Sequence, residues 1–228
     1  MARKRASMGK RELILDAALK IFAKKGFQDA TISEISRAAG VADATVYEYF
    51  KSKEDLLFSI PEKITRESAA VTSRVLSFVR TAEARLRVVV QNYFETYENN
   101  PEYASLIMLH LKTSRNFLKT RAYDVVRVPA RDLLQIIREG IENGEFKPGT
   151  DPYLVRATLL GAIEHLATRK HLLGTPATLG EYVDPLLDMV LDGIRTEKEA
   201  KAVSIHLHLS GDGVTLEAAP ERNRGKGS

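Results

Sequence analysis

The segment that most constrains the fold is residues 31–53, TISEISRAAGVADATVYEYFKSK. It contains two short helical patterns joined at Gly40, a residue that takes positive φ without strain. The first pattern opens with a capping box formed by Thr31 and Glu34, and the second runs from about Asp43 to Phe50. Two brief helices joined by a glycine turn are the layout of a helix-turn-helix. This segment therefore predicts a small helical unit near the N-terminal end.

The second pattern carries polar side chains that suit a nucleic-acid surface. Thr45, Tyr47 and Tyr49 would be unusual on a face that only meets water, but they are ordinary contacts to phosphates and base edges. Residues 1–53 hold 11 Lys or Arg and six Asp or Glu, a net charge of +5, whereas the whole chain carries +4. The excess positive charge thus lies where phosphate neutralisation would need it, which favours duplex DNA as a partner.

The remainder of the chain predicts an all-α protein. Helical periodicity continues from Ser52 through Pro61, where a bent helix is expected, and then over about 82–99, 101–112, 116–143, 151–172 and 179–196. From Val203, apolar and polar residues alternate up to Gly211-Asp212-Gly213, which predicts a C-terminal β-hairpin. We expect an N-terminal arm and helix-turn-helix at 1–53, a larger helical domain at 54–200, and the hairpin with a tail at 201–228.

The segment Ile14–Leu57 resembles the DNA-binding domain of TetR-family transcriptional regulators. The residues that carry the resemblance are Ala18, Phe22, Gly26-Phe27, Thr31-Ile32, Ile35, Ala39-Gly40-Val41, Thr45-Val46-Tyr47, Tyr49-Phe50 and Lys51-Ser52-Lys53-Glu54. The family implies a three-helix DNA-binding domain and a helical domain that binds a ligand and dimerises. By position, Thr31, Ser33, Thr45, Tyr47, Tyr49 and Lys53 match family residues that contact bases or phosphates. Residues 40–57 and 136–165 are similar to one subgroup, the acyl-CoA-responsive repressors of fatty-acid degradation.

Two features of the helix-turn-helix leave alternatives open. Ala42 stands where many family members have an N-cap residue, so the second helix begins without its usual cap unless Asp43 supplies one. Asp43 is also a candidate DNA contact, either accepting from a cytosine amino group or simply favouring the helix dipole. The basic residues Arg3, Lys4, Arg5, Lys10 and Arg11 form an arm that either reaches the DNA or stays in solvent.

The effector site is harder to read from sequence. Aromatic residues at helical spacing more often form a core than a pocket, but the family places an apolar cavity among these helices. The candidate effector-binding residues are Tyr93, Tyr97, His110, Arg115 and Phe117. If the subgroup resemblance holds, the effector is acyl-CoA or another apolar amphiphile with an anionic head.

A homodimer is expected because one recognition helix reads too few base pairs, and palindromic operators require two-fold proteins. The last two long helices carry apolar faces that suit a four-helix interface, although some of these residues must pack within the chain. The faces comprise Leu154, Ala157, Leu160, Ile163, Leu186, Leu187, Val190, Leu191 and Ile194.

Other classes of protein find little support. Cysteine is absent, no phosphate loop or nucleophile elbow occurs, and no His–Glu pair has metal-ligand spacing, so no enzyme, cofactor or metal is expected. His206 and His208 share a face of the predicted strand, but no third ligand is evident. No apolar run is long enough for a membrane span or a secretion signal, so we expect a soluble cytoplasmic protein.

The sequence thus predicts a ligand-responsive DNA-binding regulator, most readily a repressor that an effector releases from a palindromic operator. The alternative is a helical interaction scaffold that does not bind DNA.

Overall fold

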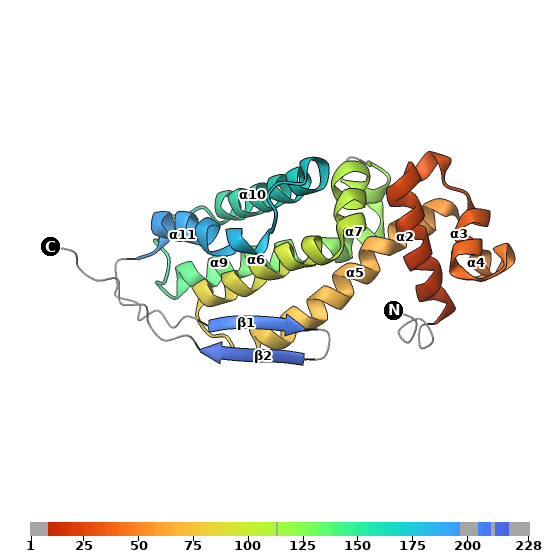
Figure 1. Ribbon diagram of the computed structural model, residues 1–228. Coiled ribbons are helices and arrows are strands. Elements are labelled where there is room, and N and C mark those ends of the chain that lie inside the picture. Colours follow the sequence, from red (N-terminus) through yellow and green to blue (C-terminus); the bar gives the residue numbers. More distant parts are fainter. Residues whose placement is uncertain (1–8, 113, 197–204, 211–212, 219–228) are drawn as a thin grey trace. The chain divides into compact units, whose positions relative to one another are not determined.

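The computed structural model describes residues 9–112, 114–196, 205–210 and 213–218 (Figure 1). The chain divides into two compact units, residues 1–195 and 196–228. The first unit is helical, as the sequence predicted. Its described helices are α2 (Lys10–Asp29), α3 (Ile32–Ala39), α4 (Asp43–Tyr49), α5 (Lys53–Leu76), α6 (Ala82–Asn99), α7 (Pro101–Leu106), α8 (Arg121–Val126), α9 (Val128–Glu142), α10 (Pro152–Leu173) and α11 (Val183–Ile194).

Helices α2, α3 and α4 form the N-terminal bundle, and its boundaries follow local chemistry. Gly26 takes φ of 77°, which breaks regular helical geometry in α2, and Phe27 then folds back so that its ring lies 5.8 Å from that of Phe22. The small core beneath contains Ile14, Ala18, Phe22, Ile35, Val46 and Phe50, all buried. This core confirms the predicted inward faces of the three helices.

Helix α5 leads from this bundle into the rest of the unit (Figure 1). It packs against α2 near its start and against α6 and α8 further along. Pro61 lies buried within it, and helical structure continues on both sides. The prediction that this proline would not end the helix is therefore confirmed.

The larger bundle differs from the sequence prediction over 101–143. The predicted helix 101–112 changes at Leu106 into a π-helical turn, Ile107–Leu111. The single helix predicted over 116–143 is wrong: a 3-10 turn at Phe117–Lys119 is followed by α8 and then α9. Thr120 has extended backbone and its hydroxyl accepts from the Tyr123 N–H at 3.2 Å, so it starts α8 afresh, and Pro129 lies in the first turn of α9.

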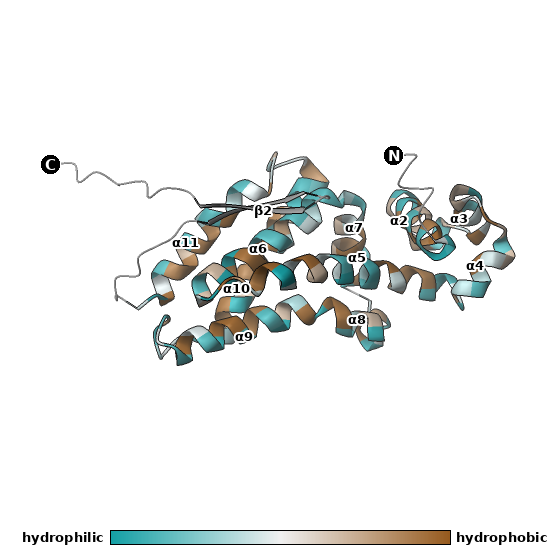
Figure 2. Cartoon of the chain, turned by 90° about the horizontal axis from the view of Figure 1, so that it is seen from below, coloured by the Kyte–Doolittle hydropathy of each residue, from teal (hydrophilic) through white to brown (hydrophobic). Residues whose placement is uncertain are grey.

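Buried residues from α6, α7, α9, α10 and α11 form the core of this bundle, continuous with that of the N-terminal helices. Both α9 and α10 carry apolar and polar residues in turn along their length, as the hydropathy colours of Figure 2 show. Gly140 of α9 lies against the buried ring of Phe146 and beside Ala82, the first residue of α6. Helix α9 therefore lies close to the start of α6.

In the second unit, β1 (Ile205–Ser210) and β2 (Gly213–Ala218) pair antiparallel, from Ile205 opposite Ala218 to Ser210 opposite Gly213. The alternation in the sequence predicted this hairpin. Val203, Gly211 and Asp212 of the predicted hairpin lie outside the described residues, as do the side chains of His206 and His208.

Candidate DNA-binding surface and effector cleft

The start of α3 is fixed by the capping box that the sequence predicted. The Thr31 hydroxyl accepts from the Glu34 N–H at 3.2 Å, and the Glu34 carboxylate accepts from the Thr31 N–H at 3.2 Å. Lys25 of α2 pairs with the same carboxylate, and this hydrogen bond, followed by that from the Thr31 backbone, holds the pKa of Glu34 below its ordinary value. The end of α2 and the start of α3 are thereby joined through the half-buried Glu34, with Thr31 itself exposed.

The turn between α3 and α4 depends on Gly40. It takes φ of 76° and ψ of 35°, and its N–H donates to the Arg37 carbonyl at 3.2 Å. The Val41 N–H then donates to the Ser36 carbonyl at 3.0 Å, so α3 ends in hydrogen-bonded backbone. The predicted glycine turn is confirmed, and it directs α4 away from the axis of α3.

Helix α4 presents its aromatic residues to solvent. Val46 is buried beneath it, whereas Tyr47 is 57% exposed and Tyr49 is 43% exposed. Thr45 lies half-buried at the same helix. The two tyrosines therefore face outward, as a groove-reading surface requires, while their contact with DNA stays a prediction.

Asp43 opens α4 and bonds to α3. Its carboxylate accepts hydrogen bonds from the hydroxyls of Ser33 and Ser36, one at each oxygen. These bonds, the one from Ser33 first, hold the pKa of Asp43 below its ordinary value, with a smaller contribution from the charge of Arg37. Ala42 is the N-cap and makes no side-chain capping bond, so Asp43 does not take the N-cap position either. Sequence reasoning placed Ser33 and Asp43 on the DNA separately and missed that they bond to each other.

Lys53 was predicted to hold a phosphate at the start of α5. Its ammonium donates to the backbone carbonyls of Gln28 and Ala30, at 3.2 and 2.9 Å, and lies 4.6 Å from the centre of the Phe27 ring. It thus joins the start of α5 to the end of α2. Ser52 caps α5 as predicted by accepting from the Asp55 N–H at 3.0 Å, but the Asp55 carboxylate accepts from the Lys51 N–H instead of closing the box on Ser52.

The basic arm is only partly described. Arg3, Lys4 and Arg5 lie outside the described residues, and Lys10 begins α2. The guanidinium carbon of Arg11 lies 5.3 Å from the centre of the Phe50 ring, at the end of α4. Arg11 of α2 therefore packs against the end of α4, within the N-terminal bundle.

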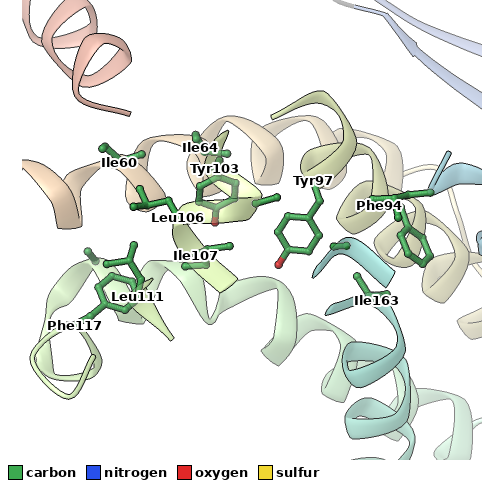
Figure 3. Close-up of a cluster of buried hydrophobic side chains, with 14 of the residues drawn as sticks. Ile60, Ile64, Phe94, Tyr97, Tyr103, Leu106, Ile107, Leu111, Phe117 and Ile163 are labelled. Atoms are coloured by element: carbon green, nitrogen blue, oxygen red, sulfur yellow. The ribbon is translucent and has the colours of Figure 1, made fainter. Parts of the chain in front are cut away.

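Three tyrosines cluster inside the larger bundle. The rings of Tyr93 and Tyr97 are 6.2 Å apart, as are those of Tyr97 and Tyr103, and Figure 3 shows Tyr97 and Tyr103 among buried aliphatic side chains. Burial raises the pKa of all three, that of Tyr103 to about 12, where a hydrogen bond with Thr65 opposes the shift. These phenol groups are therefore neutral. Two of the five predicted effector residues, Tyr93 and Tyr97, belong to this cluster.

The other predicted effector residues lie elsewhere. Phe117 is fully buried, with its ring 5.3 Å from Phe58 and 5.6 Å from Tyr123. His110 in the π-helical turn and Arg115 beyond it are both exposed. The structure thus gives Phe117 a packing role and puts the histidine and arginine at the surface.

An open cleft of 470 Å³ lies along α5, between it and α6, α8 and α9. Its walls are mainly apolar, and it is lined by Thr65, Arg66, Ala69, Ala70, Thr72, Ser73, Leu76, Val89, Asn92, Val125, Val128, Pro129 and Asp132. None of the five predicted effector residues is among them. The sequence signal that was missed is Asn92, a buried amide within the apolar face of α6.

Two polar groups of the cleft, Asn92 and Arg66, are placed by neighbouring contacts, and a third, Asp132, has a shifted pKa. The Asn92 side-chain oxygen accepts from the Ser68 hydroxyl at 2.9 Å, and Arg66 pairs with Glu62 one turn earlier at 2.8 Å. Desolvation raises the pKa of Asp132, and the charge of Arg85 opposes this shift. The cleft therefore combines apolar walls with one cation and one carboxyl, which suits an amphiphilic small molecule.

The two faces predicted for dimerisation divide between core and surface. Ile163, Leu186, Leu187 and Leu191 are buried within the chain, so these four pack internally. Leu154 is 65% exposed, and Met189, which was not among the predicted interface residues, is 66% exposed. An outward apolar surface thus remains on α10 and α11.

The described residues offer neither a metal site nor a membrane span. They contain no cluster of three or more His, Asp or Glu side chains that could hold a metal ion. Among them, too, no helix has the length and hydropathy of a membrane span.

The second helix of the helix-turn-helix, α4, faces outward as a recognition helix, and a cleft lies on α5. Together they indicate that the protein is a ligand-responsive DNA-binding regulator. Comparison with known proteins agrees: residues 14–60 match the bacterial regulatory proteins of the tetR family, and residues 62–193 match the C-terminal region of YsiA-like proteins. The chain belongs to the TetR family of transcriptional regulators, not to a family of enzymes. Regulators of this family bind operator DNA as dimers.

Individual relatives share most of the chain. The fatty acid metabolism regulator protein of Bacillus subtilis is 28% identical over 184 residues, which cover 81% of this chain and 95% of the relative. The transcriptional repressor NicS of Pseudomonas putida is 31% identical over 159 residues, covering 65% and 73%. Bacillus subtilis FadR in complex with stearoyl-CoA superimposes with a TM-score of 0.74 at 28% identity, covering 81% of this chain and 99% of that structure.

Proposed function

We propose that this protein is a cytoplasmic repressor, which binds a palindromic operator as a homodimer and is released by an acyl-type amphiphile in the cleft along α5. The observation that carries the proposal is the continuity of α5. One helix holds Lys53, bonded to the end of α2, and also the cleft residues from Thr65 to Leu76. A ligand that moves this helix must therefore act on the DNA-binding bundle.

On the DNA side, Tyr47 and Tyr49 are the leading contacts because both are exposed on α4 above buried Val46. Thr31, Thr45 and Lys53 are proposed to contribute further contacts to bases or phosphates. In the dimer, the two copies of α4 would lie one DNA turn apart, about 34–36 Å. The outward surface of α10 and α11, including Leu154 and Met189, is proposed as the dimer interface.

The cleft and the relatives both favour an acyl-type effector. Its 470 Å³ lies within the range of about 300–1,000 Å³ usual for ligand pockets. Apolar side chains such as Val89 and Pro129 suit an acyl chain, and Arg66 supplies a cation for an anionic head group. The FadR structure that is similar over most of the chain contains stearoyl-CoA.

Release is proposed to follow from a shift between two dimer conformations. Effector binding would move α5 relative to α8 and α9 and change the spacing of the two recognition helices, so that they no longer match successive major grooves. A coupling of about 1–3 kcal/mol between effector and DNA is typical of such regulators. Only an effector with different affinities for the two conformations can do this.

The test is a titration of the protein–operator complex with stearoyl-CoA, followed by fluorescence anisotropy, with coenzyme A and stearate as separate arms. Stearoyl-CoA is expected to release the DNA, and coenzyme A alone is not. Ala69→Trp fills the cleft and should abolish release while leaving operator binding intact. Ala177→Trp, on an exposed loop outside the cleft, is the matched control and should respond normally.

Two results would contradict the proposal: unchanged DNA binding at saturating stearoyl-CoA, or normal release from the Ala69→Trp protein. The effector contacts predicted at Tyr93, Tyr97, His110, Arg115 and Phe117 remain predictions. Tyr97→Phe and Arg115→Ala, in the same titration, test the buried and the exposed members of this set.

A further inference from the structure

The contact between α3 and α4 has a polar component that an ordinary helix-turn-helix core does not need. Ser33 and Ser36 are three residues apart, so their side chains lie on one face of α3. Both hydroxyls point to Asp43 at the first position of α4, each toward a different carboxylate oxygen, and the single hydrogen of Ser36 also has the Ser33 carbonyl as an acceptor at 3.1 Å. Ser36 is 3% exposed, whereas Ser33 and Asp43 are exposed. The carboxylate therefore spans from the buried contact between the helices to the surface.

We propose that Asp43 is a positioning residue for operator recognition: its carboxylate, held by Ser33 and Ser36, fixes the orientation of α4 on α3 so that Tyr47 and Tyr49 fit the groove. The proposal rests on DNA binding by this family and goes beyond it, because it assigns Asp43 a role that involves no contact with the DNA. The turn at Gly40 and the burial of Val46 and Phe50 already hold α4 in the bundle, and the hydrogen bonds to Asp43 add a polar restraint at its first residue.

Several observations favour this role over base reading. Each Asp43 oxygen already accepts from one serine, so a cytosine amino group would have to use the second lone pair of an oxygen whose position the serines restrict. The Ser33 hydroxyl has a single hydrogen, which it gives to Asp43, so it cannot donate to a phosphate at the same time. Hydrogen bonds to a charged acceptor are also stronger than those between neutral groups. Ser33 and Asp43 were predicted as two separate DNA contacts. They are better explained as parts of one hydrogen-bonded brace between α3 and α4, formed by Ser33, Ser36 and Asp43.

The experiment uses the full-length protein and a labelled duplex selected from a random-sequence pool on the wild-type protein. Anisotropy gives the affinity for this duplex and for a random-sequence duplex of equal length. The readout is the ratio of the two affinities. A variant that merely unfolds in part loses both affinities by the same factor, so its ratio stays constant, whereas a misdirected α4 loses base contacts and retains phosphate attraction.

Asp43→Ala is expected to reduce the ratio about tenfold, the effect of losing one good contact or its orientation. Ser33→Ala/Ser36→Ala should reproduce this loss, and adding Asp43→Ala to that pair should cost nothing further, because all three side chains act as a unit. Asp43→Asn keeps one acceptor oxygen and should recover part of the ratio. Glu48→Gln removes an acidic charge from the exposed surface of the same helix and should leave the ratio unchanged.

Three outcomes would overturn the proposal. If Asp43→Ala and Glu48→Gln both tighten binding to both duplexes, Asp43 acts only by repelling phosphates. If the loss in Asp43→Ala is confined to substitution of one base pair in the selected duplex, Asp43 reads that base. If the losses from the serine pair and from Asp43 multiply, the side chains act independently and there is no brace.

Discussion

Replacing Gly140 by alanine tests how closely α9, a wall of the cleft, is packed on α6. A Cβ added at Gly140 would lie 2.4 Å from two ring carbons of Phe146 and 2.8 Å from the Cβ of Ala82. Carbon atoms in contact are about 3.5–4.0 Å apart, so the ring or the helix must move by about 1 Å. Both neighbours are buried, Phe146 at 1% and Ala82 at 2% exposure.

The surroundings restrict that movement. The Phe146 N–H donates to the Gly140 carbonyl at 3.0 Å, and the Lys147 N–H donates to the Ile194 carbonyl at 2.7 Å. Overpacking of this kind costs about 1–3 kcal/mol, and alanine returns up to about 1 kcal/mol through its helix propensity. Two contacts at 2.4 Å place the cost in the upper part of this range, about 2–3 kcal/mol, so the net loss of unfolding free energy should be about 1–2 kcal/mol. A loss of this size lowers the melting temperature of a chain this long by about 2–8 °C.

The assay is thermal unfolding followed by circular dichroism at 222 nm. Gly149→Ala is the control, because Gly149 is exposed and a Cβ there meets no atom within 4 Å; it should melt at or slightly above the wild type. Phe146→Leu should be better tolerated in the Gly140→Ala background than in the wild type. A Gly140→Ala protein that melts no lower than the wild type would refute the packing argument.

Three further predictions concern the DNA-binding bundle and its link to the cleft. Tyr47→Ala and Tyr49→Ala should each weaken operator binding about tenfold in anisotropy titrations while changing the unfolding free energy by less than about 0.5 kcal/mol, because both rings are exposed. The pKa values of Glu34 and Asp43 are lower in the folded state than in the unfolded state, so both carboxylates stabilise the folded state at a pH above their unfolded-state pKa values of about 4. This stabilisation should be lost as the pH falls through the folded-state pKa values. Glu34→Gln should flatten this part of an acid-unfolding curve. Pro61→Ala should alter effector release if α5 flexes at Pro61, and unaltered release would exclude that role.

What the sequence determined about this protein lies mostly in the N-terminal bundle. The capping box at Thr31, the positive φ of Gly40 and the buried Val46 and Phe50 all follow from local rules that act over a few residues. Residues 82–99 were likewise predicted with the bounds that α6 has. These features need no knowledge of distant neighbours, which is why the helix-turn-helix and its family could be recognised from the chain alone.

Only the tertiary structure decided which side chains meet. Nothing in the spacing of Ser33 and Asp43 predicts that they bond across the turn, or that Lys53 bonds to carbonyls of α2. The cleft on α5 is formed by residues from four helices, and Asp132 of α9 is among them. Periodicity shows which face of a helix is apolar, but whether that face meets the core, a ligand or a second subunit depends on how the helices pack together.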